Sequence, residues 1–437
     1  MKHGFLSTTS LLLIPLAVFG QSQTAQDQDH DSGTEKSVLR MFKLTGSIRE
    51  RWEATDGPFS MTPADSYVVS QIRLGALFQP SDWLNFYAEA QDVRALFYQV
   101  SPSNTVSNPF DLHQAWVRIG QPEGPGFFFK AGRQDMVIGS GHLLAATDDW
   151  WVQTARNFDV ARGSYSTSFF KTELVAGSVI LVNPDAPDEH KPGDHIYADY
   201  NTFPHLLPGA SVEPYLIVRT TDNVKSKEEE IGNMDTLALG LRVAGKLPGR
   251  IDYNLEPVHE FGSYSTDRLD ANGLISGAGW VVTNSGWKPR LSTDYFYASG
   301  DDGKKNGTRE NFDNMYGYNF PMNSLTGQFG WKNIEDLRAG VEVTPWKKLK
   351  IKLNGRDFWL ANVNDGLYNA FGTRTVFNPK ATSAHVGEAV EMMATAALAK
   401  HTTIGFGVGT LFPGEYLKQS NKDQAFIYPY IYWAQTF

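Results

Sequence analysis

The sequence predicts an all-β protein, a transmembrane antiparallel β-barrel of about 18 strands with short periplasmic turns and long extracellular loops. Apolar and polar residues alternate in segments of about ten residues, the length of a membrane-crossing strand. The connections between these segments are alternately short and long. The chain also finishes on the aromatic stretch FIYPYIYWAQTF (426–437), whereas a soluble domain usually ends in a polar tail.

The N-terminal residues are expected to lie outside the barrel. Residues 1–20 combine a positively charged start, an apolar stretch and small residues near Gly20, which is the pattern of a cleaved secretory signal peptide. The apolar stretch is too short for a membrane-spanning helix. Residues 21–38 are polar and show no period, which predicts a disordered periplasmic leader. The barrel is therefore assigned to 39–437.

Composition excludes several other classes of protein. The mean hydropathy is −0.33 and no stretch after the signal is apolar enough for a helical span, so a helical membrane protein is excluded. The chain contains no cysteine, which excludes disulfides, thiolate metal sites and a lipid anchor. Acidic residues number 48 against 39 basic ones, which argues against nucleic acid as a partner.

The segment 42–53 illustrates the alternation that defines the predicted strands. One face carries Phe42, Leu44, Ile48 and Trp52, and the other carries Lys43, Thr45, Ser47, Arg49, Arg51 and Glu53. The same rule predicts eighteen strands, over 40–53, 66–79, 83–94, 111–120, 126–136, 156–165, 169–180, 195–203, 210–220, 235–245, 250–262, 277–286, 289–299, 333–344, 348–360, 385–396, 402–412 and 424–437.

The predicted connections fall into two groups. Tight turns are expected at 80–82, 246–249, 287–288, 345–347 and 397–401. Long polar loops are expected at 54–65, 95–110, 137–155, 181–194, 221–234, 263–276, 300–332, 361–384 and 413–423. Short turns at one end and long loops at the other are typical of outer-membrane barrels, in which the long loops face outward.

The last predicted strand explains the aromatic end of the chain. Ile427, Ile431, Trp433 and Phe437 share one face, which suits the lipid and the interfacial girdle of aromatic residues, while three tyrosines share the other face. A final strand of alternate apolar residues ending in Phe resembles the C-terminal signature of bacterial outer-membrane proteins. That resemblance implies two partners, the outer-membrane lipid and the barrel-assembly machinery, which would read Phe437.

Several blocks occur in an order that resembles the alginate-export family of porins. The first blocks are Gly132-Arg133-Gln134, the G-x-x-x-L step from Gly139 to Leu143, and the R-x-F-D-x-x-R pattern from Arg156 to Arg162. Later blocks are Ser299-Gly300-Asp301, Asn311 to Tyr316, Asn333 to Leu337, Gly387-Glu388 and Phe412 to Tyr416. The resemblance implies an 18-stranded porin of the bacterial outer membrane that passes a polar, anionic or carbohydrate solute, an alginate-like polysaccharide included.

Twelve charged residues are candidates for lining the solute path. Arginines hold carboxylates and stay charged, so a group of them in a narrow pore selects anions. The candidates at the mouth are Arg133, Arg156 and Arg162, with Asp135, Asp159 and Glu388 to orient them; further candidates on predicted lumen faces are Arg49, Arg51, Arg73, Lys350, Lys352 and Arg356. The alternative is that these residues form ion pairs that stiffen the wall without touching solute.

The loop 137–155 is predicted to fold into the lumen. It is long, it carries Trp150 and Trp151, and an 18-stranded barrel without an inner constriction is wide enough to leak.

Other functions are weaker interpretations. A surface adhesin or structural barrel remains an alternative to a channel, and an outer-membrane enzyme is less favoured because no catalytic set is readable. We expect no cofactor and no metal, since the ten histidines lack metal-ligand spacing. The loop 300–308 is rich in Asp and Gly, but it lacks the acidic spacing of an EF-hand calcium loop, so a plain turn-rich loop is preferred.

Overall fold

The structure is a computed structural model that describes residues 40–56, 64–100, 105–121, 124–146, 154, 156–317 and 324–437. The expected signal peptide and leader therefore lie outside the described residues. None of the helices in the described ranges is long and apolar enough to cross a membrane.

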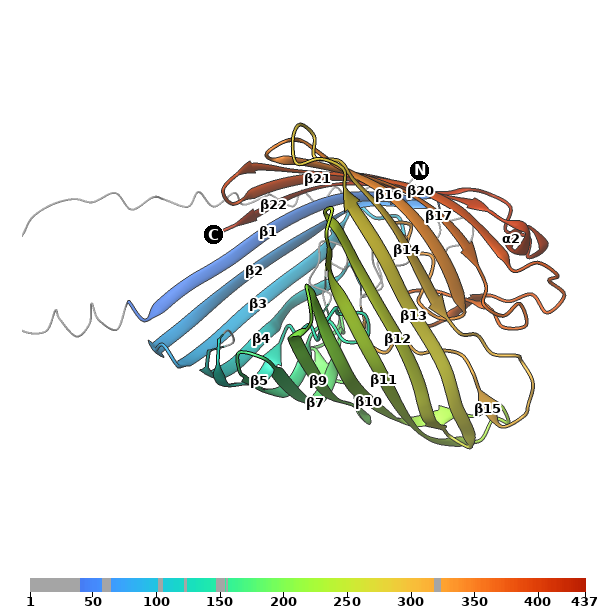
Figure 1. The fold of residues 1–437 in the computed structure, drawn as a ribbon, viewed down its shortest axis with the longest axis horizontal. Coiled ribbons are helices and arrows are strands. Elements are labelled where there is room, and N and C mark those ends of the chain that lie inside the picture. The colour runs from blue at the N-terminus through green and yellow to red at the C-terminus, as the bar shows by residue number, and fades with distance from the viewer. Residues whose placement is uncertain are drawn as a thin grey trace, which may run out of the picture. The chain divides into compact units, whose positions relative to one another are not determined.

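Within these ranges, eighteen long strands form the wall (Figure 1). They are β1 (Phe42–Thr55), β2 (Asp65–Ser81), β3 (Leu84–Leu96), β4 (Asn108–Gly120), β5 (Gly126–Gln134), β6 (Phe158–Ser166), β7 (Lys171–Leu181), β9 (Asp194–Leu207), β10 (Ala210–Lys225), β11 (Ile231–Leu247), β12 (Ile251–Tyr264), β13 (Asp267–Val281), β14 (Arg290–Ala298), β16 (Ile334–Trp346), β17 (Leu349–Trp359), β20 (His385–Ala399), β21 (Thr402–Pro413) and β22 (Phe426–Thr436).

Each long strand pairs antiparallel with its neighbours in the chain, and β22 pairs with β1. The sheet therefore closes on itself, and none of the long strands in the described part of the chain is an edge strand. Smaller elements belong to the loops: β8 (Glu189–His190), β15 (Thr308–Arg309), the pair β18 (Leu367–Tyr368) and β19 (Arg374–Val376), and the helix α2 (Glu415–Gln419). The predicted fold class, a closed antiparallel barrel of 18 strands, is confirmed.

The predicted long loop 263–276 is wrong. The strand β13 begins at Asp267, so β12 and β13 are joined by a tight turn. The alternation was hidden because the outward positions Arg268, Asp270 and Asn272 are polar, while the inward face includes the polar Asp267 and the small Gly273. A Cβ atom at Gly273 would lie 2.8 Å from the ring of Phe312. The absence of a side chain at Gly273 therefore leaves room for an aromatic ring that comes from a loop. The predicted loop 221–234 is likewise shorter, because β10 and β11 extend into it.

The two faces of the wall differ as the alternation predicts. On β22, Ile427 and Ile431 are each 44% exposed, whereas Tyr430 is 2% exposed. The apolar residues thus point outward, and the tyrosines point into the lumen. The inward position of bulky side chains depends on glycines opposite them: a Cβ at Gly407 would lie 2.4 Å from the ring of Tyr430.

The lumen is filled by side chains from the loops. Phe312, Phe329 and Trp331, from the segment between β14 and β16, are at most 1% exposed and pack in one cluster with wall residues such as Phe296 and Phe358. Each such side chain stabilises the fold by about 1.5–3 kcal/mol when it is fully buried. The loops are therefore held inside the barrel by the same apolar burial that builds the core of a soluble protein.

The C-terminal residue completes the closure between the last strand and the first. Phe437 and Gly46 exchange two backbone hydrogen bonds of 3.0 Å, and the ring of Phe437 lies on Gly46, where a Cβ atom would be 2.2 Å from it. The terminal aromatic thus has a structural role at the seam, in addition to the recognition role that the sequence predicts.

We predict that Phe437→Ala lowers the free energy of unfolding by about 1–3 kcal/mol, because the ring no longer covers the seam. Urea unfolding of barrels refolded in phospholipid vesicles measures this value. Phe406→Ala, which removes an outward ring of β21 away from the seam, is the control. An equal decrease in the free energy of unfolding in the two variants would show that the contact of Phe437 with Gly46 stabilises the barrel no more than an ordinary outward ring does.

Candidate functional site

A constriction is built from two loops that pair inside the barrel. In the loop between β5 and β6, Val137 and Ala145 form a bridge, and Leu144 pairs in parallel with Tyr316 of the loop between β14 and β16. The amide of Ala145 donates to the carbonyl of Tyr316 at 2.9 Å, and the amide of Tyr316 donates to Leu143 at 3.0 Å. The prediction that loop 137–155 folds inward is confirmed for 137–146, while Trp150 and Trp151 lie outside the described residues.

The tip of the first loop is anchored on the wall of the barrel. Glu256 of β12 accepts hydrogen bonds from Ser140 at 3.0 Å and from Tyr215 at 2.9 Å, and its carboxylate lies 2.6 Å from the imidazole of His142. Glu256 is 2% exposed, so the loop supplies polar partners to a buried carboxylate. This anchor holds the loop against the wall on the side of β12.

Two arginines flank Tyr316 at the constriction. The guanidinium of Arg219 lies 4.5 Å from the ring centre and pairs with Asp194 at 3.0 Å and Asp313 at 2.9 Å. Arg156 lies 5.3 Å from the same ring. Burial lowers the pKa of Arg156 to about 10 and the nearby Arg219 cation adds to the effect, yet Arg156 stays protonated at neutral pH. Burial opposes ionisation of Asp313, but Arg219 and Lys332 hold its pKa below the ordinary value.

A cavity of about 290 Å³ lies directly beside the first loop. Its lining residues are Val137, Gly139, Arg162, Lys171, Glu173, Tyr200, Thr202, Glu213 and Arg242. A second cavity of about 620 Å³ shares Glu213 and Arg242 with it and reaches the short turns at Gly209 and Lys246. The two spaces therefore adjoin at Glu213 and Arg242 and extend from the inner loop toward the short-turn end of the barrel.

A row of three cations crosses neighbouring strands on the lumen face. Arg118 of β4 is directly opposite Lys130 of β5, and Lys130 is directly opposite Arg162 of β6. Arg162 pairs with Glu173, and the ammonium of Lys130 lies 4.2 Å from the ring centre of Trp116. Sequence reasoning missed Arg118 and Lys130, although each alternates with outward residues such as Ile119 and Phe129 and could have been found from that pattern.

Several predicted lumen residues do face inward but serve as buried ion pairs. Arg356 is 3% exposed and contacts Asp336 at 2.5 Å and Glu391 at 3.1 Å. Arg51 contacts Glu53 at 2.5 Å. Arg51 and Arg356 therefore fit the alternative interpretation, in which the charged residues form ion pairs that stiffen the wall without touching solute.

The other inward candidates lie at different depths of the lumen. Arg73 donates to Gln91 at 2.7 Å, and Asp135 lies 3.2 Å from the imidazole of His113. Lys350 is exposed near the short turns and pairs with Glu342 at 3.1 Å. Arg49 and Lys352 share the inner face of their strands with Arg51 and Arg356.

Three predicted pore residues do not line the lumen, and these predictions are wrong. Arg133 and Asp159 pair at 3.0 Å on the outer face, because Arg133 shares a face with Phe127 and Phe129, which are 79% and 42% exposed. Glu388 also faces outward, opposite Asp357 of β17. Side chains on strands that flank one loop converge only when they occupy the same face.

The Asp- and Gly-rich loop 300–308 engages its carboxylates with lysines. Asp301 lies 2.7 Å from Lys227, and Asp302 lies 3.0 Å from Lys304. The interpretation of 300–308 as a plain turn-rich loop stays a prediction.

Comparison with known proteins places this architecture in a family. The model of the alginate export family matches residues 40–426, and the chain belongs to that family. None of the curated protein sequences matches the chain. The chain forms a closed antiparallel β-barrel that is similar in fold to the Occ outer-membrane channels.

Three solved structures illustrate the likeness in fold. The Pseudomonas aeruginosa outer membrane protein OpdK has a TM-score of 0.61 at 10% identity, covering 91% of this chain and 98% of its own. P. aeruginosa OccD3 (OpdP) has a TM-score of 0.58 at 12% identity, covering 91% of each chain. P. aeruginosa OccK2 (OpdF), in a complex with glucuronate, has a TM-score of 0.58 at 10% identity. The match covers 91% of this chain and 98% of the OccK2 chain.

We predict that deleting residues 139–143 raises the single-channel conductance severalfold, because the tip of the inner loop no longer narrows the lumen. Planar bilayer recordings measure this. Deleting 185–187, an exposed part of the loop between β7 and β9, is the control and should leave the conductance unchanged. An unaltered conductance in a folded 139–143 deletion would show that this loop does not limit the current.

Proposed function

We propose that the protein is a diffusion channel for small anionic solutes that carry a carboxylate, such as a uronate sugar. The observation that carries this proposal is the row formed by Arg118, Lys130 and Arg162 on the lumen face. Like charges directly opposite one another on neighbouring strands destabilise a sheet. A barrel wall that keeps three neighbouring positive charges, although they destabilise the sheet, is suited to attracting an anion.

The row offers donors in the geometry that a carboxylate requires. Guanidinium groups bind carboxylates through two parallel hydrogen bonds, and an ammonium adds a compact charge. Among the described residues, the buried Nε of Arg118 has no hydrogen-bond partner. A passing carboxylate would supply that partner. Charges in a low-dielectric wall also act on an ion more strongly than fully solvated charges do.

The adjoining cavity fits a small solute with hydroxyl groups. Its volume of about 290 Å³ is near the lower end of the range for small-molecule sites, which is about 300–1,000 Å³. Tyr200, Thr202 and Glu213 line it and can exchange hydrogen bonds with hydroxyls. The glucuronate complex of OccK2 supports this solute class by analogy of fold. An extended polysaccharide would require the paired loops to leave the lumen, so we favour the small solute.

Lys130→Ala and Arg118→Ala should each weaken the preference for anions, because each removes one charge from the row. Reversal potentials under a salt gradient in planar bilayers measure the preference, which should be modest in the wild type and fall with rising salt as charges are screened. Lys348→Ala, in the exposed turn between β16 and β17, is the matched control and should behave like the wild type.

The same anion preference in the wild type and in all three folded variants would contradict the proposed role of the row of Arg118, Lys130 and Arg162. Folded wild type that conducts no ions at all would instead favour the alternative of a surface adhesin or structural barrel.

A further inference from the structure

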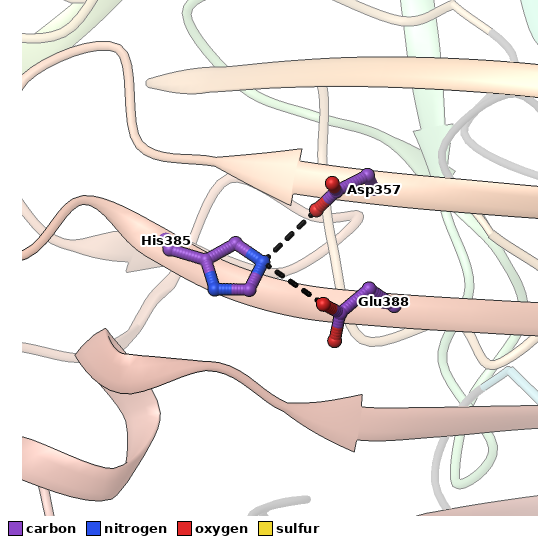
Figure 2. A group of neighbouring side chains, drawn as sticks. All are labelled: Asp357, His385 and Glu388. Carbon is purple, nitrogen blue, oxygen red and sulfur yellow. Dashed lines mark hydrogen bonds and ion pairs between the residues drawn. The ribbon is translucent and has the colours of Figure 1, made fainter.

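Figure 2 shows a histidine and two carboxylates that meet on neighbouring strands. The two carboxylates alternate with buried residues such as Phe358 and Ala389, which places the group on the outer face of the wall. Asp357 lies near the end of β17, and His385 and Glu388 lie at the start of β20. The Nε2 atom of His385 is 3.0 Å from Oδ1 of Asp357 and 3.6 Å from Oε1 of Glu388. The three potential ligand atoms all lie within 4.8 Å of one another.

An irregularity in the sheet creates this group. Residues three apart on a regular strand point to opposite faces, so His385 and Glu388 would normally be separated by the wall. The register between β17 and β20 shifts here: Phe358 pairs with Gly387, but Trp359 pairs with His385. The extra residue turns His385 to the same side as Glu388, as a β-bulge does.

Glycine is required at the bulge. Gly387 has a φ of +145°, and a Cβ atom there would lie 2.1 Å from the carbonyl oxygen of Phe412. The backbone is thus held in a conformation that only glycine adopts easily, and the consequence is the convergence of the three side chains.

We propose that Asp357, His385 and Glu388 form a binding site for a divalent transition-metal ion of the Zn²⁺ type. Zinc binds imidazole nitrogen and carboxylate oxygen at about 2.0–2.2 Å, which places tetrahedral ligand atoms about 3.4 Å apart. The observed separations of 3.0 Å and 3.6 Å lie on either side of that value. The side chains therefore need only small rotations to enclose an ion.

The donor set also fits the charge and the openness of such a site. One neutral imidazole with two carboxylates balances the charge of a divalent cation, and the mixture of nitrogen and oxygen donors suits zinc better than calcium or magnesium. The Glu388 side chain is 56% exposed, so the remaining coordination positions face outward and can hold water. Zinc sites with three protein ligands keep such an open position.

Metal binding would link the two ends of a long loop. The segment 360–384 leaves the wall directly after β17 and returns to it at β20, so an ion shared by these strands joins its two ends. A ligand that binds only the folded state stabilises it by mass action. This inference is independent of the solute proposed for the lumen.

The test is Zn²⁺ binding to the refolded full chain in detergent, measured by isothermal titration calorimetry and by retained metal after dialysis. We expect one ion per wild-type barrel and a rise in thermal midpoint on Zn²⁺ addition. His385→Ala and Asp357→Asn should each weaken binding at least tenfold. Binding should also weaken as pH falls, because protons compete for the ligands. Calcium in place of zinc should bind more weakly.

His259→Ala is the matched control. His259 also lies on the outer face of the wall, but its imidazole meets the amide oxygen of Asn272 at 3.1 Å. This variant should bind zinc as the wild type does. Folded wild type that retains no zinc would reduce the group to an ion pair between histidine and aspartate, and binding unaffected by His385→Ala would place the metal elsewhere. Either result overturns the proposal.

Discussion

The structure depends on the backbone pairing of β22 with β1. This pairing closes the sheet, so every long strand in the described ranges has a partner on each side and none of them leaves an open backbone edge. Closure also fixes the face of every side chain, since residues of a closed sheet point either into the lumen or outward. Phe437, at the seam with Gly46, belongs to this constraint.

The closed wall makes an enclosed space that the protein then fills. Small residues such as Gly273 leave room for rings that arrive from the loops, and Phe312 and Trp331 occupy it. The loops bring polar groups as well, and His142 reaches Glu256 across 114 positions of sequence. What remains open is a set of polar spaces beside the inner loop, bordered by Arg162 and Arg242. The open space inside the wall is therefore set by this partial filling rather than by the diameter of the wall.

Much of the wall could be predicted from the sequence, because alternation is a local property. All eighteen predicted strands overlap the observed ones. The prediction of a loop at 263–276 was wrong because the outward positions at the start of β13, Arg268, Asp270 and Asn272, are polar and break the apolar-outward pattern. Arg133 was placed in the lumen because it flanks a long loop, although its alternation with Phe127 and Phe129 already indicates the outer face.

The site was less predictable, for physical reasons. The contact between Leu144 and Tyr316 joins loops far apart in sequence, and no periodic pattern records it. The convergence of His385 with Glu388 depends on a register shift at Trp359, which reverses the face that simple alternation assigns. By contrast, the inward position of Arg118 and of Lys130 was within reach of sequence reasoning through alternation, although their placement directly opposite each other depends on the register of β4 and β5.

The central claim is that the faces of β5 separate a lumen cation, Lys130, from an outer-face cation, Arg133. The chain has no native cysteine, so single cysteines at these positions report their surroundings cleanly. The most direct measurement is the bilayer conductance of Lys130→Cys and Arg133→Cys before and after reaction with a bulky, negatively charged, water-soluble thiol reagent. The account predicts that modification lowers the conductance and the anion preference of Lys130→Cys and leaves Arg133→Cys unchanged. The opposite pattern, or an equal response at both positions in folded protein, would contradict it.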